Sequence, residues 1–161
     1  MIARPMSIAA LLALLTLLSA CGVMLPGAPS APGRPTPSRP APIADRLIDL
    51  DGACNQTEDD GFHENARLAV RDNQVQVLSW QMRIGRRGSC SFELGAFQQI
   101  KSRPHIELVE RDGSGCKLMV WQEPRRITMA HTGCAKHCTP GVYESAWPVM
   151  FDPATGGCAR P

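Results

Sequence analysis

The alternation of apolar and polar residues through positions 66–129 constrains the fold of this chain most strongly. Leu68 and Val70, for example, alternate with Arg67 and Arg71, which is the pattern of a strand with one buried face. Similar segments follow at 75–84, 90–94, 97–100, 106–109, 116–121 and 127–129, separated by polar or glycine-containing turns. Short strands joined in this way predict a mainly β domain, a small antiparallel meander or half-closed barrel over residues 62–131.

The same pattern predicts a bulge, a turn and a core. Val75 and Val77 share one face, but the phase then changes to Leu78 and Trp80, which indicates a β-bulge near Val77. Residues 72–74, Asp-Asn-Gln, predict a turn. The expected core consists of Leu68, Val70, Leu78, Trp80, Phe92, Ile106, Leu108, Leu118, Val120 and Ile127.

The segments on either side of the meander lack this alternation. Residues 43–61 are rich in acidic side chains, and we expect them to start the domain irregularly. Residues 142–147 predict one helical turn that ends before Pro148, and residues 152–157 predict a loop. The C-terminal segment is therefore expected to be irregular and to wrap the sheet.

Six cysteines fall within the expected domain, and we expect all six to form disulfides: Cys54, Cys90, Cys116, Cys134, Cys138 and Cys158. An even number of cysteines in an exported chain is typical of a disulfide framework. The spacing alone leaves the pairing open. The pair that we favour joins Cys138 to Cys158, which would tie the C-terminal segment to itself.

The N-terminus predicts export and a lipid anchor. Arg4 precedes an apolar run over residues 8–18, which is too short to span a membrane but fits a signal peptide. Residues 18–21, Leu-Ser-Ala-Cys, resemble the lipobox of bacterial lipoproteins at all four positions. The resemblance implies that residues 1–20 are removed and that Cys21 is acylated, which anchors the chain through several acyl chains. Gly22, where an Asp would imply inner-membrane retention, favours the outer membrane.

A spacer separates the lipidated N-terminus, residues 21–25, from the exported domain, residues 43–161. Residues 26–42 contain proline at roughly every second or third position, which excludes a helix or a central strand. We expect an extended tether at ~3.1 Å per residue, with a reach on the order of 50 Å.

Charge and motifs exclude several function classes. The net charge is +2, and removal of Arg4 leaves +1, without the strong positive charge that is typical of nucleic-acid binders. Residues 49–52 lack a third acidic calcium ligand, and no Gly-x-Ser-x-Gly motif accompanies the pairs His63–Glu64 and His105–Glu107. The sequence therefore predicts no enzyme and no cofactor.

A zinc site is the strongest metal hypothesis that the sequence offers, and we do not favour it. His131, Cys134, His137 and Cys138 fall within eight positions and are natural zinc donors. In an oxidising compartment, however, both cysteines are expected in disulfides. We therefore predict no metal.

Two charged surfaces are candidate partner sites. Arg83, Arg86, Arg87, Arg125 and Arg126 flank turns and would suit an anionic surface such as lipid A phosphates. The acidic stretch Asp45–Asp60 would suit a basic protein. A solvated rim is the alternative interpretation of both.

In architecture, the chain resembles the membrane-bound lysozyme inhibitors of Gram-negative bacteria: lipobox, tether, short meander and C-terminal cysteines. Ser114-Gly115 matches the Ser-Gly pair of their inhibitory loop, whereas Cys116-Lys117 departs from it. We therefore expect an outer-membrane lipoprotein with a non-catalytic binding domain, in the periplasm or at the cell surface, that resembles a lysozyme inhibitor. The alternative is a structural or assembly lipoprotein that contacts another envelope protein or lipopolysaccharide.

Overall fold

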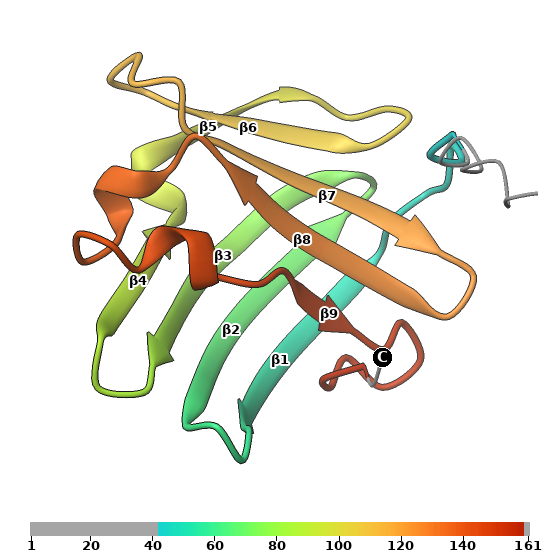
Figure 1. The fold of residues 1–161 in the computed structure, drawn as a ribbon. Helices are drawn as coiled ribbons and strands as arrows, with labels where there is room; N and C mark the ends of the chain where they lie inside the picture. Colours follow the sequence, from blue (N-terminus) through green and yellow to red (C-terminus); the bar gives the residue numbers. More distant parts are fainter. Residues whose placement is uncertain (1–41, 160–161) are drawn as a thin grey trace, which may run out of the picture. The chain divides into compact units, whose positions relative to one another are not determined.

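The computed structural model describes residues 42–159, which form two antiparallel sheets (Figure 1). The predicted signal peptide, Cys21 and the tether up to residue 41 lie outside the described residues. The first sheet contains β1 (Leu50–Thr57), β2 (Phe62–Arg71), β3 (Gln74–Ile84) and β4 (Gly88–Glu93), in that order. The second contains β5 (Phe97–Lys101), β6 (Ile106–Glu110), β7 (Lys117–Glu123), β8 (Arg126–Thr132) and β9 (Val149–Phe151).

The prediction of a mainly β, antiparallel domain is confirmed, although the strands form two meanders, one in each sheet, where the sequence predicted one. Every strand pairs with its sequence neighbours within its own sheet, and the 3-10 helix Leu94–Ala96 carries the chain from one sheet to the other. Within residues 42–159 the two sheets do not pair with each other, so the barrel is not closed. At one side β1 lies beside the C-terminal segment, where Ala53 N donates to Gly156 O at 2.8 Å.

The inner faces of both sheets share one hydrophobic core, and all ten predicted core residues are buried in it. Trp80 and Phe92 are fully buried, with their ring centroids 5.1 Å apart. The core also includes residues that the sequence analysis did not select, such as Phe97 and Phe151. Alternation therefore identified the buried faces of β2, β3, β4, β6, β7 and β8 correctly.

The predicted bulge and turn are also present. In the β2–β3 pairing, Ala69 lies opposite Val77 but Val70 lies opposite Val75, so Gln76 is the extra residue of a bulge next to Val77. Asp72 and Asn73 both have positive φ, 49° and 59°, at the tip of this hairpin. Short polar side chains tolerate this conformation, so the turn follows from the sequence.

The prediction that residues 43–61 are irregular is wrong, because this segment contains β1. Leu50, Gly52, Cys54 and Gln56 face inward and the residues between them face outward. A Cβ on Gly52 would lie 2.8 Å from Cδ1 of Phe151, so the close approach of that ring excludes a larger residue. The inward residues are thus mostly small or polar, so the sequence of β1 does not show the alternation of apolar and polar residues that is expected of a strand.

The C-terminal segment is irregular as predicted, with one strand that was missed. The predicted helical turn is the 3-10 helix Tyr143–Ser145, and a second 3-10 helix spans Ala135–His137. The short strand β9 pairs with β8 and extends the second sheet. No helix among residues 42–159 is long and apolar enough to span a membrane.

All six cysteines form disulfides, but the favoured pair Cys138–Cys158 is wrong. The bonds are Cys54–Cys158, Cys90–Cys138 and Cys116–Cys134. Cys138 follows the 3-10 helix that lies against β4, whereas Cys158 lies beside β9 and β1. Disulfides therefore join the C-terminal segment to the two edge strands of the first sheet, β1 and β4, rather than to itself.

Candidate binding groove

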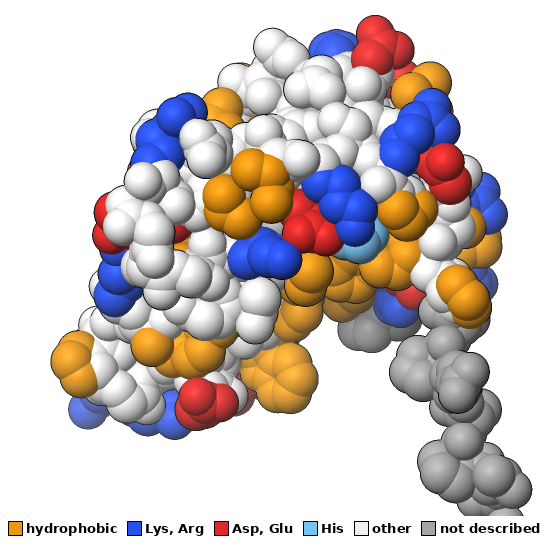
Figure 2. Space-filling view, turned by 90° about the horizontal axis from the view of Figure 1, so that it is seen from above, with side chains coloured by type: hydrophobic (Ala, Val, Ile, Leu, Met, Phe, Trp, Pro, Cys, Tyr) orange, Lys and Arg blue, Asp and Glu red, His pale blue; other side chains and the backbone are white. Residues whose placement is uncertain are grey.

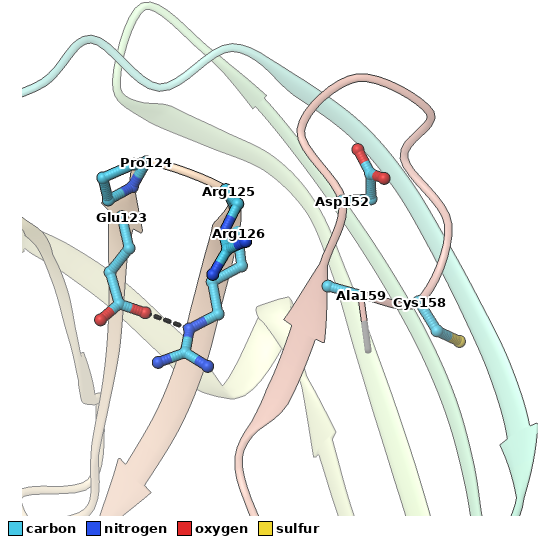
Figure 3. Close-up of a pocket in the computed structure, with 7 residues that line it drawn as sticks. All are labelled: Glu123, Pro124, Arg125, Arg126, Asp152, Cys158 and Ala159. Atoms are coloured by element: carbon cyan, nitrogen blue, oxygen red, sulfur yellow. Dashed lines mark hydrogen bonds and ion pairs between the residues drawn. The ribbon is translucent and has the colours of Figure 1, made fainter. Parts of the chain in front are cut away.

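Two adjoining cavities form an open groove along the second sheet. The larger, of about 700 Å³, lies between the β7–β8 turn and the segment around Asp152 and Cys158 (Figure 3). The smaller, of about 460 Å³, is lined by the β1–β2 hairpin on one side and by β7, β8 and β9 on the other. They share Glu123, Arg126 and Ala159, so we treat both as one groove.

Aromatic side chains border the smaller cavity. Trp147 stands just before β9 and is 69% exposed, the largest exposed fraction among the large hydrophobic side chains of residues 42–159. Trp121, on β7, and Phe62, at the start of β2, line the same cavity. A solvent-exposed indole beside a second one offers flat apolar faces to a ligand.

Glu64 lies at the base of the smaller cavity and is 1% exposed. Its two carboxylate oxygens accept hydrogen bonds from Trp80 Nε1 at 2.8 Å and from Gln56 Nε2 at 2.9 Å. Burial raises the pKa of this carboxyl, and the two hydrogen bonds oppose that effect only in part. The carboxylate is thus fixed in position by two donors.

Glu123 and Arg126 form an ion pair where the two cavities meet (Figure 3). The hydrogen bond from Arg126 lowers the pKa of Glu123, and Glu123 in turn raises that of Arg126. Thr128 lies beside Glu123, yet its buried Oγ1 makes no hydrogen bond of good geometry with the described residues. The groove therefore contains polar groups at its centre and aromatic groups at its border.

The five predicted binding arginines do not form one patch. Arg83, Arg86 and Arg87 lie at the β3–β4 turn and Arg125 and Arg126 at the β7–β8 turn, on opposite sides of the view in Figure 1. The three at the β3–β4 turn are exposed and make no ion pair with another described residue. Arg125 and Arg126 instead line the groove.

Most of the acidic stretch Asp45–Asp60 is occupied by internal contacts. Asp45 pairs with Arg103 at 3.0 Å, and Asp51 pairs with Arg67 at 2.7 Å. Asp49 and Asp60 accept hydrogen bonds from the backbone amides of residues 72 and 62. Glu58 and Asp59 make no such contact within the described part of the chain and are exposed.

The zinc hypothesis is not supported by the placement of its four residues. Cys134 and Cys138 are in different disulfides, and His131 stacks between Phe92 and Tyr143 with both ring nitrogens buried and without hydrogen bonds. Burial lowers the pKa of His131. A different group, Glu110, Cys116 and His137, has donor atoms within 4.8 Å of one another. Because Cys116 is oxidised, this group also lacks a thiolate.

The two His–Glu pairs that the sequence contains have different surroundings. In the first, His63 Nδ1 lies 2.9 Å from the Thr57 hydroxyl on the exposed side of the β1–β2 hairpin, whereas Glu64 is buried. On the outer face of the second sheet, Glu107 accepts hydrogen bonds from Lys101 and Lys117, both at 2.8 Å, and lies 2.7 Å from His105 Nε2. Hydrogen bonds from the two lysines lower the pKa of Glu107 to about 2. Figure 2 shows basic, acidic and histidine side chains side by side on this face. The Glu107 carboxylate is therefore held by two lysine donors.

The sequence analysis missed the groove residues Glu64, Trp121 and Trp147. Glu64 stands two positions after Phe62 and two before Ala66, so it faces the same buried side of β2. A carboxylate at such a position was the one sequence signal for this site. Trp121 and Trp147 come from separate segments, and only the fold brings them to one cavity.

No protein-family model, no curated protein and no solved structure matches this chain.

Proposed function

We propose that this chain is an outer-membrane lipoprotein whose exported β domain is a non-catalytic binding module, and that it binds its ligand in the groove. The observation that carries the proposal is Trp147, which is 69% exposed at the border of a cavity that Trp121 also lines. Exposed tryptophan is uncommon on a surface unless it meets a partner, because the large ring gains most from being covered.

The lipid anchor and the tether support the same proposal from the sequence. Cys21 would hold the chain at the membrane, and residues 26–42 would allow the domain to reach a partner on the order of 50 Å away at ~3.1 Å per residue. Three disulfides suit an oxidising compartment outside the cytoplasm. In a mature chain, intact-mass analysis of membrane-extracted protein should find acylated Cys21 at the N-terminus. An unmodified chain that begins elsewhere would rule out the anchor.

A lysozyme inhibitor is one specific form of this proposal. An assembly lipoprotein that binds outside the groove is the alternative to it, and the two differ in partner charge. A basic lysozyme would have to meet Glu58 and Asp59, because the other acidic groups of that stretch are already paired or bonded. An anionic envelope partner would have to meet Arg83, Arg86 and Arg87. Lysozyme activity that is unchanged by excess purified protein would eliminate the inhibitor form.

The test of the groove is affinity capture from envelope extract. The bait is the mature chain, residues 21–161, with Cys21→Ser to keep it unacylated. Trp147→Ala should abolish capture. Ile100→Ala is the matched control, since Ile100 is 57% exposed but lies on β5 and does not line the groove. Equal capture by wild type and Trp147→Ala would contradict the proposal.

A further inference from the structure

We infer that the ligand of the groove is an uncharged carbohydrate chain. This inference rests on the proposed function, because it names the class of ligand for the same groove. The aromatic surfaces, the hydrogen-bonding groups, the charge and the volumes of the two cavities support it.

The aromatic groups of the smaller cavity match one side of a sugar ring. A pyranose ring presents C–H bonds on its faces and hydroxyl groups around its edge. Trp147 and Trp121 provide flat apolar surfaces on which such a face can pack. A purely apolar ligand fits less well, since it would cover Gln56, Glu64 and Thr128 without providing hydrogen bonds to them.

The polar groups of the same cavity match the hydroxyl edge. Ligand hydroxyls can donate to the carboxylates and to the amide oxygen of Gln56, and can accept from the Arg126 guanidinium. Glu64 already accepts two hydrogen bonds and is 1% exposed, so the ligand hydroxyls would bind chiefly to Gln56, Glu123 and Arg126. Because Trp80 and Gln56 already fix Glu64, little side-chain ordering is required when a ligand binds.

The charge of the cavity disfavours a charged ligand of either sign. Among the described residues that line the smaller cavity, the one guanidinium is that of Arg126, and it is already paired with Glu123, so these residues offer no free cation to a phosphate or sulfate. A cationic ligand is also disfavoured. Arg126 already neutralises Glu123, and burial raises the pKa of Glu64, which disfavours the charged form of that carboxyl. Among the described residues that line the smaller cavity, this leaves Glu58 as the one exposed charge without an ion pair; the larger cavity adds one residue of each sign, Arg125 and Asp152.

The length of the groove favours an oligomer over a single small molecule. The smaller cavity, about 460 Å³, and the larger one, about 700 Å³, have Glu123, Arg126 and Ala159 in common among their lining residues. Both are open to solvent along their length rather than closed. A chain of sugar rings can lie in such a groove, with one part on the two tryptophans and the next between the β7–β8 turn and the segment around Asp152 (Figure 3).

The test is to titrate the Cys21→Ser mature chain with soluble tetrasaccharides. Tryptophan fluorescence and calorimetry measure the binding. The probes are β-1,4-linked N-acetylglucosamine, β-1,4-linked glucose and α-1,4-linked glucose, with choline and inorganic phosphate as charged probes. At least one tetrasaccharide should bind saturably and independently of salt. Trp147→Ala and Gln56→Ala should each weaken binding by about tenfold or more, the loss of ~1.4 kcal/mol of binding energy. Ile100→Ala should leave binding unchanged.

Three results would overturn the inference: saturable binding of choline or phosphate but of no saccharide, no saturation by any tetrasaccharide, or saccharide binding that Trp147→Ala does not weaken. The failure of this inference is distinguishable from failure of the proposed function. If capture from envelope extract depends on Trp147 while no tetrasaccharide binds, the groove is the binding site and its ligand is not a carbohydrate.

Discussion

The hydrogen bond from Trp80 to Glu64 gives the sharpest stability prediction. Trp80 is fully buried, and its Nε1 donates to a carboxylate that is itself 1% exposed. Trp80→Phe keeps an aromatic ring against Phe92 and His131 but removes the donor. A hydrogen bond to a charged group contributes ~1.5–3 kcal/mol to stability, against ~0.5–1.5 kcal/mol for a neutral pair. The smaller ring adds a cavity term that does not depend on the charge of Glu64.

The two contributions separate in a double-mutant cycle with Glu64→Gln. Because burial raises the pKa of Glu64, the folded domain binds this proton more readily than the unfolded chain, and ionisation lowers stability as pH rises through that pKa. Glu64→Gln should therefore be at least as stable as wild type at pH 7. In the Glu64→Gln background, Trp80→Phe should cost about 1–2 kcal/mol less than in wild type, because only a neutral bond is lost.

Urea unfolding at pH 7 and at pH 4, followed by circular dichroism, measures both effects. The cost of Trp80→Phe should be smaller at pH 4 than at pH 7, as a larger fraction of Glu64 is protonated there. Equal costs at both pH values and in both backgrounds would show that Glu64 is not a buried charge held by Trp80, and the reasoning would fail.

Three further predictions follow from the described contacts. Gly156→Ala should destabilise the domain far more than Gly113→Ala by thermal unfolding, because both have positive φ (73° and 75°) but only Gly156 would place a Cβ 2.3 Å from a backbone oxygen of β1. The ion pairs of Glu107, whose pKa is about 2, should stabilise the fold above pH 4.5 and be lost as pH falls toward 2; Glu107→Gln should flatten acid unfolding over that range. Thiol labelling of the denatured, unreduced protein should find no free side chain among the six cysteines of the domain, and Cys54→Ser with Cys158→Ser should lower stability by ~2–5 kcal/mol.

Much of the fold could be predicted from the sequence, since the long strands alternate clearly. Between Leu68 and Ile127, the alternation predicted ten core residues, and all ten are buried. β1 was missed because Gly52, Cys54 and Gln56 occupy its inward positions, and each is there for a tertiary reason: a nearby Phe ring, a disulfide and a buried carboxylate. Periodicity of hydrophobic residues cannot detect a face that is built from such residues.

The candidate site was less predictable, because it depends on which segments the fold brings together. The arginines were grouped by their closeness to turns, yet Arg86 and Arg125 lie at separate turns (Figure 1). The spacing of the cysteines could not predict the disulfide pairs either. Cys158 pairs with a cysteine of β1 that lies 104 positions earlier in the sequence. Trp147 lies in the irregular C-terminal segment, and nothing in the sequence indicates that it lines the same cavity as Trp121.

The measurement that tests the central claim most directly is amide hydrogen exchange of the Cys21→Ser mature chain, with and without the fraction that it captures from envelope extract. If the groove is the binding surface, exchange should slow at the amides of Arg125 and Trp147, two exposed residues that line it, and stay unchanged at the β3–β4 turn, residues 85–87. Slowed exchange at residues 85–87 alone would place the partner on the exposed arginines and contradict the account.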